Sequence, residues 1–349
     1  PPVVTPPPTD PLGPVGTLQE EQDRLFESIG MNAIVPGYDN MMTQMAGLQS
    51  ASTTYCADTS TGDFALVQQA WRDAMSAWQA IEIVRFGPIE EGSRRLRIQF
   101  FPDANNAVLN NVSQVLAGGQ VITEALIAGS PVGTQGLPAV EYLLFDLGGL
   151  DDATNGPRRC ELLIAVSQNL STMANELATE WSMGGQLLAD FTSASGVFAD
   201  REEVLTNILE SLAVEAEFVA DEKLTRPIAT GATTTESFRS EFSVESLMTN
   251  TAAIRSFLDI GTATTDYGMR DYLVRAHNAD AISGQLDTQL ASAENGLAAL
   301  TASLEAILLG TASGDVDVVR VAMQDLADSF VDAAVAADVN LGFNNQDGD

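Results

Sequence analysis

The strongest constraint on the fold is the spacing of apolar residues, which recur at alternating steps of three and four along most of the chain. This spacing places them on one face of an α-helix and is typical of helices that bury that face. Alternating β-branched runs bounded by hairpin turns, which would indicate strands, are absent. The clearest stripe consists of Phe64, Val67, Trp71, Ala74, Trp78 and Ile81. We therefore expect an all-α fold.

The same periodicity predicts helices along the whole chain. Pro36 is expected to kink the first of them, because proline has no backbone N–H to donate within a helix. Thr233 and Glu236 form the T-x-x-E pattern of a capping box, which predicts a helix start there. The predicted ranges are 20–55, 64–81, 104–128, 137–145, 163–181, 205–223, 239–259, 279–306 and 316–338.

A Gly- and Ser-rich stretch at residues 183–200 divides the predicted helices into two sets. Because each set has apolar faces to bury, we expect two packed helical bundles, residues 19–190 and residues 191–349. Their layouts are loosely similar, which is compatible with a duplicated pair but does not prove one. Residues 1–18 are rich in proline and without apolar periodicity, so they are expected to form an extended tether.

The charge balance restricts the partners. The chain has 48 acidic and 16 basic residues, a net charge of −32, and Lys223 is its only lysine. Such a field repels nucleic acid and anionic membrane surfaces, so we expect neither as a partner. No apolar run approaches the roughly 20 residues that cross a bilayer. The tether fits a segment behind a removed signal or a lipid-anchored cysteine, which predicts an exported protein held at the membrane only by that anchor.

Cys56 and Cys160 are the only cysteines. In an oxidising compartment they can pair, which would close a loop of about 100 residues and stabilise the fold by about 4–5 kcal/mol on the chain-entropy model. The alternative is two separate buried thiols. The sequence does not decide between the two.

Several catalytic and metal-binding patterns are excluded. His277 is the only histidine, so neither HExxH nor any two-histidine zinc site can exist within one chain. GxSxG, Walker A and GxGxxG sequences are also absent. The acidic loops 146–155 and 347–349 lack the spacing of an EF-hand. Three arginines form a small basic loop, which we expect to pair with Glu90 and Glu91. They are Arg94, Arg95 and Arg97.

Charges that interrupt apolar helix faces are the candidate functional residues, because a buried carboxylate must be paired, protonated or bound to a ligand. Glu82 and Arg85 lie where the stripe that ends at Ile81 would continue. Being three residues apart, they can contact each other. An ordinary salt bridge at a helix end is the alternative to a functional role.

Glu141 is the only charged residue in the segment GLPAVEYLLF, residues 136–145. Gly136 permits a tight entry and Pro138 suits a first helical turn. A two-turn helix that is apolar on every side is buried, so Glu141 is expected to be buried and to need a partner. The candidate partners are a metal ion, Arg72, Arg85 and Lys223.

A third candidate lies in residues 233–247, TTTESFRSEFSVESL. Ser240 and Ser243 are expected on the same helix face as Leu247, with Glu236 one turn earlier. Hydroxyls and a carboxylate at a helix start can form the wall of a polar cleft. The alternative for Glu236 is a purely local role as the acid of the capping box.

These segments together resemble the imelysin-like family of bacterial envelope proteins. The matching segments follow one another in the expected order over nearly the whole folded body. They are AWRDAMSAWQAIEIVRFGPI (70–89), RIQFFPD (97–103), GLPAVEYLLF (136–145), PRRC (157–160), DEKLTRPI (221–228) with the serine-rich run after it, and LGFNNQDGD at the end.

The resemblance implies a fold of two helical bundles, a cleft between them lined by a G-x-H-x-x-E segment, and a periplasmic or lipid-anchored location. It also implies a link to iron uptake, and some members are classed as M75 peptidases. In this chain Gly136 and Glu141 match the motif, but Pro138 stands in place of the histidine. A metal at Glu141 would therefore need other oxygen ligands, first of all Glu82, and such ligands favour hard ions such as ferric iron.

We therefore expect a non-catalytic envelope protein that binds a metal ion, iron among them, or a small ligand, and that contacts other envelope iron-uptake proteins. One alternative is an M75-type peptidase, for which the sequence offers no nucleophile or base. Another is a partner-binding protein that has lost the metal site, which a Glu141–Arg85 bridge would favour. The predicted cleft residues are Glu82, Arg85, Gly136, Pro138, Glu141, Lys223, Glu236, Ser240 and Ser243, with Glu82 and Glu141 as candidate metal ligands.

Overall fold

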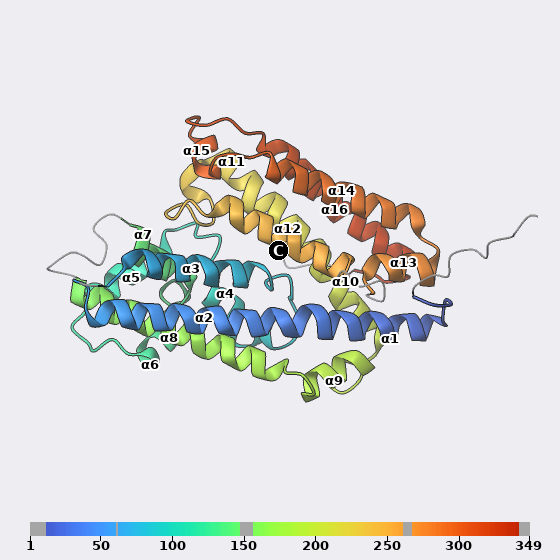
Figure 1. The fold of residues 1–349 in the computed structure, drawn as a ribbon, viewed down its shortest axis with the longest axis horizontal. Coiled ribbons are helices and arrows are strands. Elements are labelled where there is room, and N and C mark those ends of the chain that lie inside the picture. Colours follow the sequence, from blue (N-terminus) through green and yellow to red (C-terminus); the bar gives the residue numbers. More distant parts are fainter. Residues whose placement is uncertain (1–11, 61, 147–155, 261–266, 342–349) are drawn as a thin grey trace, which may run out of the picture.

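The computed structural model describes residues 12–60, 62–146, 156–260 and 267–341. Every regular element in those ranges is helical, so the all-α prediction is confirmed (Figure 1). No helix in this part of the chain is both long enough and apolar enough to span a membrane. The predicted tether and the acidic loops lie partly or wholly outside these ranges.

The first element is a long helical rod. It consists of α1 (Leu18–Ile29), a π-helical segment (Gly30–Ile34) and α2 (Val35–Ala57). Thr17 begins α1 with a complete capping box to Glu20. The π-helical segment lies directly before Pro36, and its wider turn accommodates a residue that lacks an N–H and crowds the preceding turn.

Some of the remaining helices of the first half pack on this rod, and the others pack on those helices. They are α3 (Phe64–Gln79), α4 (Arg94–Ile98), α5 (Ala107–Ala117), α6 (Glu124–Ala128), α7 (Leu137–Phe145), α8 (Gly156–Glu180) and α9 (Gln186–Ser193), with 3₁₀ segments at Gly87–Ser93 and Val132–Thr134. α2 lies along α8 and α3, and α9 packs on α1. The stripe with Trp71 and Trp78 is buried from Val67 to Ile81, as its spacing predicts, and Phe64 at its start is partly buried.

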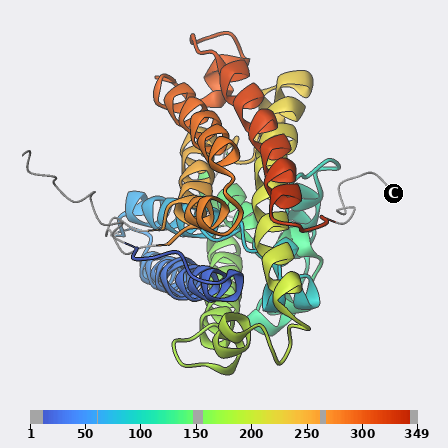
Figure 2. The same ribbon diagram turned by 90° about the vertical axis from the view of Figure 1, so that its right-hand side faces the viewer.

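The second half forms its own layer, above the first in Figures 1 and 2. α16 packs on both α10 and α14, α12 packs on α14, and the two layers meet mainly where α12 contacts α3 and α13 contacts α1. The elements are α10 (Arg201–Phe218), a π-helical segment (Val219–Thr225), α11 (Arg226–Thr230), a 3₁₀ segment (Ala232–Thr234), α12 (Ser243–Leu258), α13 (Met269–His277), α14 (Asp280–Ala298), α15 (Leu304–Leu308) and α16 (Val316–Ala336). The division at 190/191 remains a proposal, and that point lies within α9.

Four predicted helix boundaries were wrong. The predicted helix 104–128 is two helices, α5 and α6, because Gly118 and Gly119 end the first. The predicted helix 279–306 likewise divides into α14 and α15. The helix expected to end near Lys223 continues through a π-helical segment into α11. The helix expected from 239 starts at Ser243.

The predicted capping box of Thr233 and Glu236 does not form. Thr233 lies in a 3₁₀ segment, and Glu236 is buried in the turn that follows it. The Glu236 carboxylate accepts hydrogen bonds from side chains of the first layer and contacts Lys223. A long-range charge contact therefore outweighs the local capping preference, which amounts to about 1 kcal/mol.

A buried ion pair attaches the start of α1 to α13. Glu21 is fully buried and accepts hydrogen bonds from the Tyr267 hydroxyl (2.6 Å) and the Arg275 Nε (3.1 Å). Arg275 also donates to the backbone carbonyls of Gly13 and Pro14. The last residues of the predicted tether are therefore fixed to the folded body.

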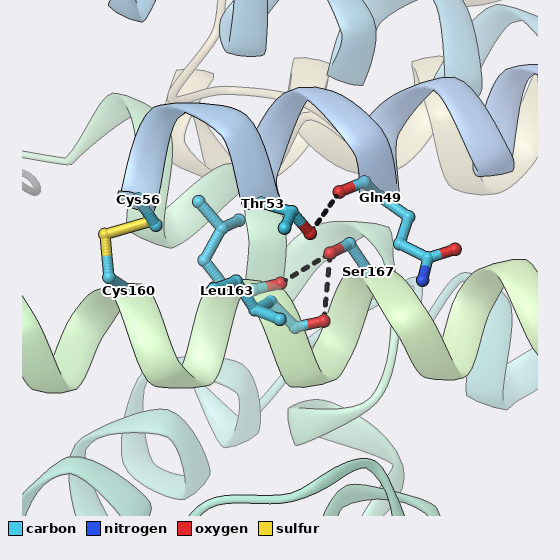
Figure 3. Close-up of a disulfide and its surroundings, with 7 residues drawn as sticks. Gln49, Thr53, Cys56, Cys160, Leu163 and Ser167 are labelled. Atoms are coloured by element: carbon cyan, nitrogen blue, oxygen red, sulfur yellow. Dashed lines mark hydrogen bonds between the residues drawn. A yellow bond between two sulfur atoms is a disulfide. The ribbon is translucent and has the colours of Figure 1, made fainter. Parts of the chain in front are cut away.

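Cys56 and Cys160 form a disulfide, which answers the question that the sequence left open. It joins the end of α2 to the first turns of α8, and Figure 3 shows the two helices side by side at that point. Cys160 is buried and Cys56 packs against the core. The bond closes a loop with a sequence separation of 104 residues.

Replacing both Cys56 and Cys160 with serine should lower the free energy of unfolding by about 4 kcal/mol, because the unfolded chain regains the freedom that the closed loop removes. Urea unfolding followed by circular dichroism measures this change. Wild-type protein unfolded in the presence of a reductant is the control and should match the double variant. An unchanged unfolding midpoint in both samples would contradict the prediction.

Candidate functional site

The buried polar residues gather where the two layers meet, and Lys223 is at their centre. It comes from the π-helical segment that follows α10, and only 2% of its side chain is exposed. Its Nζ donates to Gln79 Oε1 (2.6 Å), Asn250 Oδ1 (2.9 Å) and Glu82 Oε1. These three bonds use all three N–H donors of the ammonium group. Glu236 Oε2 lies 3.2 Å from the same nitrogen.

We call these five residues the Lys223 cluster: Gln79, Glu82, Lys223, Glu236 and Asn250. Their amides connect the carboxylates to one another. Asn250 Nδ2 donates to Glu82 Oε1 (2.8 Å), and Gln79 Nε2 donates to Glu236 Oε1 (3.0 Å). A buried charge is tolerated only with such compensation. The cluster joins the end of α3 and the turn after it to α12 and the turn before it.

Three cations surround the ring of Phe218 at the edge of the cluster. The guanidinium carbons of Arg85 and Arg95 each lie 5.1 Å from the ring centre, and Lys223 Nζ lies 5.3 Å away. Arg85 donates to Glu215 Oε2 at 2.7 Å. Arg95 lies 4.0 Å from Glu82 Oε2. Cations over an aromatic face are stabilised by the ring quadrupole.

The charges of this region balance when all groups are ionised, with three carboxylates against three cations. Burial opposes the charge on Lys223, but Glu236 and Glu82 outweigh it and raise the Lys223 pKa. Burial opposes ionisation of Glu82 as well, yet the charges of Lys223 and Arg95 bring its pKa below the usual value. We conclude that Lys223 and Glu82 form the ionised pair.

The other two carboxyls hold their protons more strongly. Burial and the charge of Glu82 raise the pKa of Glu215. Burial raises the pKa of Glu236, although the Lys223 charge opposes it. Protonation of either group would leave this region with a net positive charge, in a chain whose overall charge is −32.

Glu141 is buried on α7, as its sequence context predicts. Its Oε1 accepts from the Ser240 backbone N (3.0 Å) and the Ser240 Oγ (2.7 Å), and its Oε2 lies 3.9 Å from Arg239. Burial is the largest influence and raises the pKa of Glu141 to about 7. The bond to Ser240 connects α7 in the first layer to the turn before α12 in the second.

The three side chains predicted as partners of Glu141 have other partners, so that part of the prediction was wrong. Arg72 lies over the ring of Phe145, Arg85 pairs with Glu215, and Lys223 pairs with Glu82. The predicted contact between Glu82 and Arg85 is wrong for the same reason, since each has a partner from the second layer. The spacing in the sequence predicted an ion pair between Glu82 and Arg85, but in the fold each of them pairs with a residue far away in the sequence.

Gly136 and Pro138 shape the entry to α7. A Cβ on Gly136 would lie 2.4 Å from the carbonyl oxygen of Ile98, so only glycine allows the backbone of residues 97–98 to approach so closely. Pro138 is buried in the first turn of α7, where a missing N–H has no cost. Both residues position Glu141.

Ser240 and Ser243 do not share a helix face, contrary to the prediction. Ser240 lies in the turn before α12 and contacts Glu141, whereas Ser243 is the first residue of α12. The Ser243 Oγ donates to Glu305 Oε1 at 2.5 Å, and Thr235 donates to the same oxygen at 2.5 Å. Ser243 therefore belongs to a second polar group, which faces α15.

Several buried polar atoms around these groups have no hydrogen-bond partner among the described residues. Such atoms are uncommon in folded proteins, and each implies a water molecule or a ligand atom. Most of them line the contact between the layers. They include Gln99 Oε1, Glu215 Oε1, Ser237 Oγ, Ser246 Oγ, Glu305 Oε2, Arg85 Nε and Arg95 Nε.

The three arginines of the predicted basic loop form α4 instead, and their predicted pairing with Glu90 and Glu91 is wrong. Because α4 faces α8, Arg94 donates to Glu180 (2.9 Å) and Glu176 (3.2 Å). Arg97 donates to Gln135. Only Arg95 turns toward the Lys223 cluster.

The side chains do not fit the predicted metal site. Within the described ranges, no group of three or more His, Cys, Asp or Glu side chains is arranged to hold a metal ion. Glu82 already neutralises Lys223, and Glu141 already accepts from Ser240. The only histidine, His277, lies 3.0 Å from the Tyr272 hydroxyl on α13. A bare cation at Glu82 would have to displace the Lys223 ammonium.

Residues that the sequence prediction missed complete the site. Gln79 and Asn250 are amides on buried helix faces, and Glu215 is a carboxylate inside the apolar stripe of α10. A polar residue within an apolar face is the signal that revealed Glu141, so the same criterion applied to amides would have found Gln79 and Asn250. Nothing local distinguishes Arg95 from Arg94.

The fold and the site define a class: an all-α protein of two packed layers with a buried, charge-balanced polar cluster between them. Residues 34–332 match the sequence model of the imelysin family, peptidase family M75. The chain belongs to the imelysin family. A search of curated protein sequences found no match.

Two solved structures are similar over almost their whole length. One is from Parabacteroides distasonis and is provisionally described as an iron-regulated protein A precursor; it covers 95% of this chain and 97% of its own, with 17% identity and a TM-score of 0.77. The other is an imelysin-like protein from Psychrobacter arcticum, which covers 95% and 99% respectively, with 17% identity and a TM-score of 0.68. At this identity the likeness establishes the fold.

Replacing Lys223 with methionine should lower the free energy of unfolding by about 3–5 kcal/mol, because Glu236 loses its paired cation and Glu82 keeps only the more distant Arg95, at 4.0 Å. Chemical denaturation measures the loss. Arg226→Met, one turn further on, is the control, since its pair with Glu222 is partly exposed and contributes at most about 1 kcal/mol. An equal loss of unfolding free energy in both variants would show that the Lys223 cluster contributes no more to stability than a partly exposed ion pair.

Glu141 should make the protein less stable as the pH rises. Its folded pKa of about 7 exceeds the ordinary 4.5, so the folded state binds the proton more tightly than the unfolded state does. The stabilisation is full below about pH 4.5 and is lost toward pH 7, by about 1.4 kcal/mol per pH unit.

Urea unfolding of wild type and Glu141→Gln at pH 5 and pH 7 measures this contribution. The variant keeps an acceptor for Ser240 but cannot ionise, so the difference between the two proteins should change with pH in its favour. A difference that stays constant over this range would mean that Glu141 titrates normally.

Proposed function

We propose that this protein is a non-catalytic binding protein of the cell envelope, which holds a small polar ligand at the contact between its two helical layers. The observation that carries the proposal is the set of buried polar atoms without partners around the Lys223 cluster. Ordered water or a bound ligand satisfies such atoms in folded proteins. A ligand that bridges the layers would satisfy them.

An extracytoplasmic location is supported by the disulfide between Cys56 and Cys160, since such bonds persist in oxidising compartments. A similar structure is described as a precursor of an iron-regulated protein. On this likeness we propose a link to iron uptake and other envelope iron-uptake proteins as partners. Because the cluster does not fit a bare metal ion, the proposed ligand is a small molecule, and iron would enter only as part of it.

The proposal can be tested by removing two hydroxyl groups that have no hydrogen-bond partner among the described residues. Ser237→Ala and Ser246→Ala together should leave the melting temperature unchanged, because neither hydroxyl has a hydrogen-bond partner in the part of the chain that the structure describes. The probes are ferric and ferrous ions, citrate, inorganic phosphate, amino acids and sugars, each tested for an increase in melting temperature. We expect at least one organic or anionic probe to stabilise wild type and the variant to lose part of that shift.

A matched control is Ser256→Ala on the same helix, where the hydroxyl donates to a backbone carbonyl of α12. It should respond to the probe as wild type does. Stabilisation by metal ions alone, or an equal response of all variants, would argue against ligand binding at this contact.

Hydrolysis is the second candidate, and one observation favours it. The Ser240 Oγ donates to Glu141 at 2.7 Å, and Glu141 has a pKa of about 7, as a nucleophile and its base require. Labelling of Ser240 by a fluorophosphonate, abolished in Glu141→Gln, would support a peptidase of the M75 type. Absence of labelling at neutral pH would leave Glu141–Ser240 as a structural contact between the layers.

A further inference from the structure

Arg95 is largely buried, and its guanidinium makes an ion pair with Glu82 but no hydrogen bond to any described residue. Only 18% of its side chain is exposed, and its Nε is buried without a partner among the described residues. Its nearest carboxylate oxygen is Glu82 Oε2, at 4.0 Å. Guanidinium groups in such positions normally donate to two or more oxygens, and an unpaired buried donor costs free energy.

Arg85 lies close to Arg95, over the same Phe218 ring. One of its nitrogens donates to Glu215, but its Nε is also buried and unpaired, and 13% of its side chain is exposed. Burial and then the charge of Arg85 lower the pKa of Arg95, so the two cations are close enough to repel each other. Two adjacent, underused guanidinium groups form a site for a shared negative charge.

The charges of Glu82, Glu215 and Glu90 act on Arg95, but none of these carboxylates accepts a hydrogen bond from it within the described ranges. Glu82 is engaged by Lys223 and Asn250. Glu215 and Glu236 both retain their protons more strongly than an exposed carboxyl does. A proton on either leaves a positive sum of charge, and a bound anion would restore the balance.

Part of each arginine side chain is exposed, 13% for Arg85 and 18% for Arg95, whereas only 2% of the Lys223 side chain is. The ring of Phe218 lies beneath both guanidinium groups, 5.1 Å from each. Two planar forks held on one aromatic ring suit a group with several coplanar or tetrahedral oxygens.

We propose that Arg95 and Arg85 bind an oxyanion group, a carboxylate or a phosphate, of a small ligand at the edge of the Lys223 cluster beside Phe218. The inference rests on the proposed function, in which this contact between the layers holds a ligand, and it assigns the chemistry of that ligand. It also agrees with the poor fit of a bare cation, because the unpaired donors here belong to two cations, Arg85 and Arg95.

Calorimetric titration with citrate and with inorganic phosphate at low ionic strength tests the proposal. Wild type should bind at least one of them with a stoichiometry near one, and added sodium chloride should weaken the binding. Arg95→Gln should weaken it by about tenfold or more, as expected for loss of a charge-assisted hydrogen bond. Arg95→Lys should recover part of the affinity, because it restores the charge without the fork.

Arg94→Gln is the matched control. It removes an arginine from the same helix, but one whose guanidinium is already paired with Glu176 and Glu180. Its affinity should stay within about twofold of wild type, since it loses no contact with the anion. Circular dichroism and melting temperature of Arg95→Gln confirm that the variant is folded.

Binding of citrate alone would identify a carboxylate ligand, and binding of phosphate alone a phosphorylated one; both support the proposal. Failure of wild type to bind either anion, or equal binding by Arg95→Gln, overturns it. If a neutral sugar or amino acid stabilises the protein and Ser237→Ala with Ser246→Ala removes that effect while the anions do nothing, the proposed function stands and the assignment of an anion fails.

Discussion

The contact between the two layers depends on one buried ammonium group. Lys223 donates to Gln79 and Glu82 from the first layer and to Asn250 from the second. Removing a charge from water costs several kcal/mol, so this arrangement persists only if every donor is satisfied. The geometry of three N–H groups then fixes where the end of α3, the π-helical segment after α10 and α12 lie relative to one another.

The π-helical segment is part of that constraint. An extra residue per turn shifts the side chains that follow it around the helix axis, and such segments occur often at functional sites. Here the segment Val219–Thr225 includes Lys223 and begins directly after Phe218. The ring and the ammonium group therefore lie side by side, and the two arginines from the first layer complete the arrangement around that ring.

Sequence alone predicted the fold class and the burial of Glu141, because both follow from local periodicity. The apolar stripe that contains Trp71 and Trp78 requires a helix with a buried face. A charged residue in a helix that is apolar on every side must be buried, because that helix has no exposed face. The partners were not predictable in the same way. Glu82 and Arg85 are neighbours in sequence, yet each pairs across the layers, with Lys223 and Glu215 respectively.

The predicted start of α12 was wrong for a related reason. Glu236 has the local pattern of a capping acid. Its ion pair with the buried Lys223 ammonium stabilises the fold by more than a helix cap would. Glu236 therefore lies in a turn, and α12 starts only at Ser243. At a residue that makes a long-range charge contact, the chain does not adopt the conformation that its local sequence favours. A broken local rule is therefore itself a signal for the site.

The substitution of Pro138 for the motif histidine fits this balance of charge. The proline keeps the first turn of α7 and leaves Glu141 to Ser240 and Arg239, which requires no metal. The carboxylates of the site accept from Lys223 and from hydroxyl or amide donors, whereas the Nε atoms of Arg85 and Arg95 have no partner among the described residues. Under the proposed function these two arginines would bind a negatively charged group of the ligand, although the chain as a whole is strongly acidic.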